Sequence, residues 1–111
     1  MNDAVHFLFV FARFEGFLKE RSDQFLIQKA NYPNYRAAIS WQLLKEDADK
    51  DHLHFKKHLR LFIDSGAHDF ATVIYWYNIR NTLAHGGLYN TPINVGTAIS
   101  GLLQISRSFV I

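Results

Sequence analysis

A chain of 111 residues has the length of one ordinary domain, and its 49% apolar content is enough for a single hydrophobic core. We therefore expect one domain over residues 1–111, without a linker. The chain has no cysteine, which excludes disulfide bonds and thiolate metal ligands and makes a cytoplasmic location the expectation. The formal net charge of +2 at pH 7 permits a nucleic-acid partner but is too small to argue for one.

The most apolar stretch, Phe7 to Ala12, is far shorter than the roughly 20 residues that a membrane-spanning helix needs. Arg13 and Glu15 bring charge immediately after it. The N-terminus carries Asp3 where a signal peptide would carry basic residues, so we expect neither a membrane helix nor a leader peptide.

A first helix is predicted over residues 3–21, because apolar residues recur at steps of three and four, the spacing of one helix face. This stripe comprises Phe7, Val10, Phe11, Phe14, Phe17 and Leu18. Leu8 and Phe9 add apolar surface beside the stripe. The helix should therefore be covered on more than one side, by the core and by a second subunit.

The turn Asn31-Tyr32-Pro33-Asn34 separates this helix from the next, because proline disfavours helical geometry in the residue before it. A second helix is predicted from Tyr35 to Leu44. A weaker third helix follows between Leu53 and Ile63, and Ser65-Gly66 ends it.

The longest uninterrupted helical pattern runs from Asp69 to Ala84 and ends at Gly86-Gly87. A last helix is predicted from Thr91 as the N-cap, with Pro92 in the first turn, to Phe109. No alternating strand pattern competes with these segments. The predicted fold class is therefore all-α, an up-and-down bundle of four to five helices.

The third helix carries a basic cluster, preceded by an acidic run over residues 46–51. The cluster consists of Lys56, Lys57 and Arg60, with His52, His54 and His58 beside them. A solvated helix face is the simpler interpretation, and a phosphate-binding track is the alternative. His54 and His58 lie one turn apart, but no carboxylate at ligand spacing completes three metal ligands in this segment, so no metal site is predicted.

Residues 80–87 read Arg-Asn-Thr-Leu-Ala-His-Gly-Gly, at the end of a strongly apolar helix. Asn81 and His85 are one turn apart on the same face, so the amide is placed to orient the imidazole. Arg80 lies about 140° around the helix from His85 at 100° per residue. Its long side chain can bend toward the helix end, where the glycines allow unwinding. Because Arg matches phosphate oxygens and His moves protons near neutral pH, both groups are suited to one phosphate.

This segment resembles the signature of the HEPN superfamily, in which Arg and a following polar residue precede a His four to six positions later. Phe14-Glu15-x-x-Leu18 in the first helix is also similar to family members. The resemblance implies a HEPN-like helical domain and a metal-independent endoribonuclease whose catalytic residues are Arg80, Asn81 and His85. His85 would exchange the proton and Arg80 would stabilise the phosphorane. The ribose 2′-hydroxyl would attack the neighbouring phosphorus and produce a 2′,3′-cyclic phosphate. The reaction would require no cofactor.

The resemblance also implies the partners of the chain. RNA would be its substrate. One motif supplies a single Arg and a single His, whereas two copies facing each other across a two-fold axis supply two of each, so a homodimer is expected. Small family members often act as toxins or phage-defence effectors beside a nucleotidyltransferase-type antitoxin. The alternative is an inactive domain that binds nucleotides, RNA or protein, in which Arg80 and His85 serve only to cap the helix.

Substrate-binding candidates surround the motif. Tyr77 lies one turn before Arg80, Trp76 is beside it, and Tyr89 follows the two glycines. Each could stack on a base, although aromatic residues at helical spacing are more often part of a core. Glu15 is expected to pair with Arg80 across the bundle and set its rotamer, with a plain surface salt bridge as the alternative.

Overall fold

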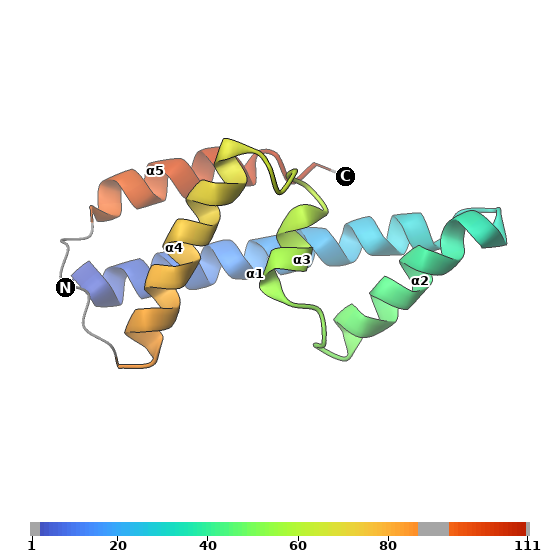
Figure 1. Cartoon of the computed structure of the whole chain (residues 1–111), viewed down its shortest axis with the longest axis horizontal. Coiled ribbons are helices and arrows are strands. Elements are labelled where there is room, and N and C mark those ends of the chain that lie inside the picture. The colour runs from blue at the N-terminus through green and yellow to red at the C-terminus, as the bar shows by residue number, and fades with distance from the viewer. Residues whose placement is uncertain (1–2, 87–93, 111) are drawn as a thin grey trace.

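The computed structural model describes residues 3–86 and 94–110, and within these ranges it contains helices and no strand (Figure 1). The predicted all-α helical bundle is confirmed. The longest helix, α1 (Asp3–Ala30), has 28 residues and is therefore about 42 Å long at 1.5 Å per residue. Since the molecule measures 51 × 25 × 24 Å, α1 defines its long axis.

Helix α1 continues well past the predicted end at residue 21. The buried stripe of Phe7, Phe11, Phe14 and Leu18 extends through Ser22 and Leu26 at the same helical spacing. The prediction was wrong because Ser22 interrupts the apolar pattern, although its side chain is fully buried. The predicted turn at residues 31–34 is confirmed, and it ends the helix.

Helix α2 (Tyr35–Asp49) folds back along the C-terminal half of α1 (Figure 1). Asn34 caps it, because its Oδ1 accepts a hydrogen bond from the backbone N–H of Arg36 at 2.9 Å. Phe25 of α1 meets Trp41 of α2 edge to face, with ring centroids 5.6 Å apart. Among the described helices, α2 contacts α1 alone.

The other three helices pack on the N-terminal half and the middle of α1 (Figure 1). They are α3 (Phe55–Arg60), α4 (His68–Ala84) and α5 (Val95–Ser106). The last one begins later than predicted: Asn94 is the N-cap, and its Oδ1 accepts from the backbone N–H of Thr97 at 3.0 Å. The predicted cap, Thr91-Pro92, lies outside the described residues.

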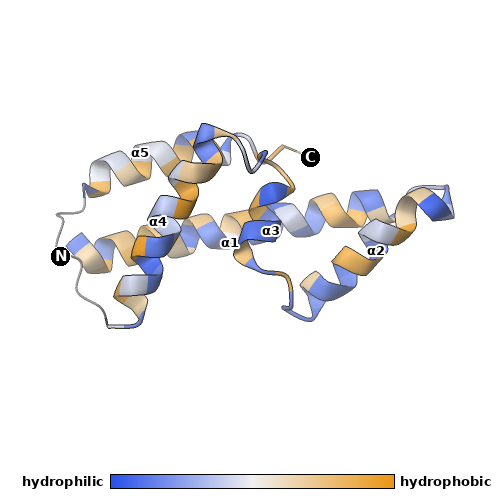
Figure 2. Cartoon of the chain, in the orientation of Figure 1, coloured by the Kyte–Doolittle hydropathy of each residue, from blue (hydrophilic) through white to orange (hydrophobic). Residues whose placement is uncertain are grey.

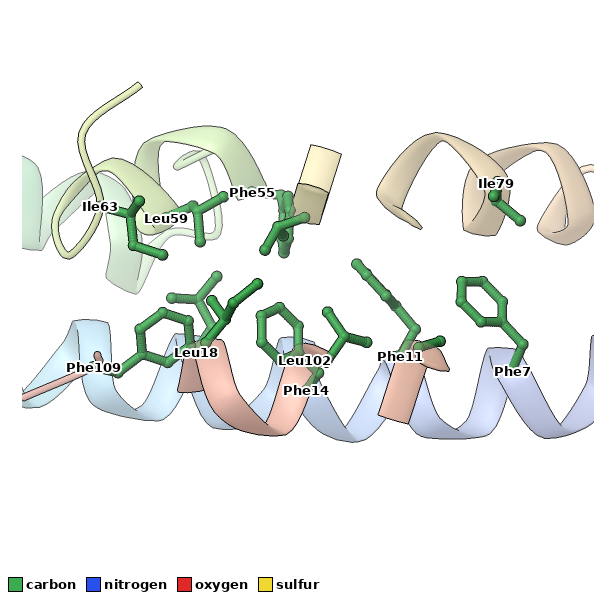
Figure 3. Packing of buried hydrophobic residues seen from close by; sticks show 13 residues of the cluster. Phe7, Phe11, Phe14, Leu18, Phe55, Leu59, Ile63, Ile79, Leu102 and Phe109 are labelled. Atoms are coloured by element: carbon green, nitrogen blue, oxygen red, sulfur yellow. The ribbon is translucent and has the colours of Figure 1, made fainter. Parts of the chain in front are cut away.

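The core lies between α1 and these three helices and is rich in aromatic rings. Figure 3 shows Phe7, Phe11 and Leu18 of α1 pointing toward the side chains of the opposite helices, such as Phe55 and Ile79. Hydrophobic residues along α1, α2 and α4 are interspersed with hydrophilic ones (Figure 2). Among the described helices, none combines the length and apolarity that crossing a membrane demands.

Candidate functional site

Helix α4 ends as its sequence predicts. The backbone N–H of His85 donates to the carbonyl of Asn81 at 3.1 Å, and that of Gly86 donates to the carbonyl of Leu83 at 3.2 Å. Gly86 has a φ of +76°, in the left-handed region where a Cβ is disfavoured. Gly87 lies outside the described residues. Glycine at position 86 therefore stops the helix directly after His85.

Arg80 points from α4 toward α1, where Glu15 receives it. Its Nη2 lies 3.8 Å from Oε1 of Glu15, which confirms the predicted pairing. Lys19, one turn further along α1, approaches the same carboxylate at 3.6 Å. Two cations thus share one carboxylate, so the cluster retains excess positive charge. The Arg80 side chain is 35% exposed, and an ion pair of this length and exposure contributes less than about 1 kcal/mol. A phosphate could replace it at little cost.

Asn81 has a different partner from the one predicted. Its Oδ1 accepts a hydrogen bond from Nη1 of Arg80 at 2.9 Å, and the expectation that the amide orients His85 is wrong for this structure. The neighbouring side chain competes for the amide because the guanidinium is the stronger, charged donor. Within this structure Arg80 therefore contacts both Asn81 and Glu15.

His85 is exposed at the C-cap of α4. Its side chain makes no hydrogen bond or ion pair with the described residues, so Arg80 and His85 do not meet within this chain. The helical geometry explains this separation, since Arg80 faces α1 and His85 lies about 140° around the helix from it. The predicted exposure of both groups at the helix end is confirmed.

Tyr77, one of the predicted base-stacking residues, has its ring in the core. It stacks on Phe55 with centroids 4.3 Å apart and an interplanar angle of 10°, and Phe11 is its next aromatic neighbour. Phe55 covers one face of the Tyr77 ring, so a base cannot stack there, and the prediction of base stacking is wrong for that face. Trp76 is likewise partly buried, against Phe7. Tyr89 lies outside the described residues.

Ser22 and His58 form a buried polar pair that the sequence pattern did not predict. Oγ of Ser22 and Nδ1 of His58 share a hydrogen bond of 2.6 Å, and the two residues are 0% and 5% exposed. Burial lowers the pKa of His58 below its ordinary value of 6.5, and the charge of Lys19 lowers it further. Hydrogen bonding to the backbone of Leu53 and the charges of Asp51 and Glu15 oppose this shift. His58 is thus a neutral core residue.

The position of His58 also corrects the proposed basic cluster. His58 faces inward, whereas Lys56, Lys57 and Arg60 are exposed on the outer face of α3. A polar residue at the core register of α1, as Ser22 is, signals a buried partner. The sequence alone does not show which residue is the partner of Ser22, because His58 is 36 positions away.

The chain matches no protein-family model, no curated protein and no solved structure.

Proposed function

We propose that this chain is a metal-independent endoribonuclease of the HEPN type. The observation that carries the proposal is the end of α4, where a partly exposed Arg80 and an exposed His85 flank one helix terminus. The resemblance of residues 80–87 to the HEPN signature supplies the expected chemistry.

Arg80 is the phosphate-binding group. Its weak, shared ion pair with Glu15 holds the guanidinium in place without neutralising the cluster, because Lys19 adds a second positive charge. Lys56, Lys57 and Arg60 are exposed on α3, a helix that contacts α4, and we propose that they add contacts to the RNA backbone.

His85 is the proton carrier. The 2′-hydroxyl oxygen attacks the adjacent phosphorus while its proton passes to an imidazole, and the bond from phosphorus to the 5′ oxygen breaks. That oxygen takes a proton and leaves as a 5′-hydroxyl, so the products are a 2′,3′-cyclic phosphate and a 5′-hydroxyl end. DNA lacks the nucleophile and should not be cut.

A homodimer would complete the site. Arg80 and His85 diverge around α4. In a dimer, His85 of one copy can therefore approach a phosphate held by Arg80 of the other copy more readily than a phosphate held by Arg80 of its own chain. Two copies also supply both an acid and a base. The biological role we propose is that of a toxin or phage-defence effector in the cytoplasm, with a nucleotidyltransferase-type antitoxin as its regulator.

The second candidate is an inactive domain that binds nucleotides, RNA or protein. The bonds of Arg80 to Glu15 and Asn81, and its separation from His85, favour this reading for the isolated chain. The two candidates differ in whether phosphate binding is followed by bond cleavage.

The test is incubation of labelled RNA and DNA of the same sequence with purified protein in EDTA. We expect RNA to be cut and DNA to survive, with cyclic-phosphate ends on the RNA fragments. His85→Ala, purified in parallel, controls for contaminating nucleases. RNA binding without cleavage, at any pH and with or without a partner, would establish the second candidate instead.

A further inference from the structure

A groove runs between α1 and α5. The first hollow, of about 420 Å³, is almost entirely apolar and is lined by Val10, Arg13, Phe14, Phe17, Ile99, Leu102, Leu103 and Ser106. A second hollow adjoins it and shares Phe17 and Ser106; it adds Arg21, Arg107, Phe109 and Val110. The two hollows therefore share part of their walls, and we refer to them together as the groove.

Every charged residue in the lining of this groove is an arginine: Arg13, Arg21 and Arg107. Two of them lie over aromatic rings. The guanidinium carbon of Arg13 is 5.8 Å from the centre of the Phe9 ring, and that of Arg21 is 5.1 Å from the centre of the Phe17 ring. These contacts hold positive charge at the rim and leave the floor apolar.

Two apolar side chains of the lining, and Phe9 beside Arg13, are largely exposed. Phe9 is 59% exposed, Leu103 58% and Val110 72%. An apolar surface bordered by arginines is the composition of a protein-binding site rather than of a solvated helix face.

We propose that this groove binds an acidic amphipathic helix of a partner protein. The apolar face of such a helix, with anchors at positions i, i+3 or i+4, and i+7, would fill the floor between α1 and α5. Its flanking carboxylates would pair with the three arginines. Helix α5, with 12 residues, is about 18 Å long and offers room for roughly three turns of the partner.

The charge pattern also argues against a second copy of this chain in the groove. A two-fold interface centred here would bring Arg13, Arg21 and Arg107 of each copy toward the same residues of the other, and like charges at an interface oppose association. Phosphates could pair with the arginines, but most of the apolar floor is aliphatic, whereas RNA bases stack on aromatic rings.

The groove is separate from the proposed nuclease site. Glu15, which receives Arg80, lies about 140° around α1 from Val10 in the groove lining. A helix in the groove would therefore leave the contact between Arg80 and Glu15 uncovered. The inference does not depend on the proposed function.

The experiment uses three synthetic helical peptides of about 14 residues, or roughly four turns, with the same leucine spacing. One carries glutamates on its flanks, one carries lysines at those positions, and one is a scrambled form of the acidic sequence. We expect the acidic peptide to bind the full chain at least about tenfold more tightly than the other two in fluorescence anisotropy. The amide NMR signals that shift should belong to α1 and α5.

Two variants make the test specific. Leu103→Glu places a carboxylate in the groove and should weaken binding of the acidic peptide by about tenfold or more. Leu43→Glu is the matched control, because Leu43 is 56% exposed and lies on α2, away from the groove. Both variants should keep the circular dichroism of the parent.

Three outcomes would overturn the proposal. The lysine peptide could bind as well as the acidic one, or Leu103→Glu could leave binding unchanged. The parent could sediment as a dimer that Leu103→Glu dissociates, which would make the groove an interface between copies. Arg13→Glu could abolish RNA binding while the acidic peptide still binds, which would assign the arginines to nucleic acid.

Discussion

His58 lies in the core between α1 and α3, whereas His85 stands exposed at the end of α4. The first shares a short hydrogen bond with buried Ser22, and burial lowers its pKa. The second makes no side-chain hydrogen bond or ion pair with the described part of the chain. The same imidazole thus packs in the core in one place and faces solvent in the other. Surroundings, rather than residue type, separate a structural histidine from a candidate catalytic one.

The largest effect should come from His85→Ala. Loss of the proton carrier should lower the rate of RNA cleavage by roughly 10²- to 10⁴-fold, the usual contribution of a general acid or base. RNA binding should persist, and the unfolding free energy should change by less than about 0.5 kcal/mol because the side chain is exposed. Single-turnover cleavage and urea titration measure the two effects. A parental cleavage rate in the folded variant would show that His85 has no part in catalysis.

Arg80→Ala should impair both steps, since the guanidinium is proposed to hold the phosphate and to stabilise its charge. We expect a loss of cleavage of about 10²-fold or more, together with weaker RNA binding. Arg80→Lys keeps the charge but not the planar donor array, so it should regain binding without regaining the rate. Filter binding and cleavage kinetics on the same RNA distinguish the two. If Arg80→Lys regained RNA binding and the cleavage rate to the same extent, only the charge of Arg80 would matter.

For His58, the buried histidine, the expected effect is on the free energy of unfolding. Ser22→Ala leaves Nδ1 of His58 without its partner and should lower the unfolding free energy by about 1 to 3 kcal/mol. Ser100→Ala is the matched control, because Ser100 is exposed on α5 and should change stability by less than about 0.5 kcal/mol. Urea denaturation of both variants measures the difference. Equal values would mean that the hydrogen bond contributes nothing.

The smallest effect is a dependence of stability on pH. Because the pKa of His58 is lower in the folded chain than its ordinary 6.5, the unfolded chain binds the proton first as the pH falls below about 6.5. Stability is therefore intact above that pH and decreases below it, by at most about 1.4 kcal/mol per pH unit for one proton. Lys19, Glu15 and Asp51 are the charged groups that act on His58.

Two matched variants isolate this dependence. His58→Gln should remove the contribution of His58 to the slope of stability between pH 6.5 and lower values, whereas His85→Gln should retain it. Urea titrations across this range give the slope for each protein. A slope that disappears with His85→Gln instead would reverse the assignment of the two histidines.

Much of this arrangement could be predicted from periodicity and turn residues. The all-helical fold, the turn before Tyr35 and the stop after His85 all follow from local rules of helix formation. The pairing of Arg80 with Glu15 followed from the order of the helices and a matched charge.

The features that escaped prediction depend on contacts between distant segments. The length of α1 escaped prediction because Ser22 is polar in the sequence, and the partner that explains its burial, His58, lies on another helix. Asn94 rather than Thr91 begins α5, and several cap-forming residues in that segment made the choice ambiguous. Asn81 binds Arg80 instead of His85. Helical spacing alone does not show which of the two side chains binds the amide.

We propose that the end of α4 cuts RNA through the ribose 2′-hydroxyl group. The most direct measurement is the chemical identity of the ends that the parent chain and His85→Ala produce from one RNA in EDTA. We expect a 2′,3′-cyclic phosphate on one fragment and a 5′-hydroxyl on the other, with the yield from His85→Ala lower by roughly 10²-fold or more. Fragments with 3′-hydroxyl ends, or equal yields from the two proteins, would contradict it.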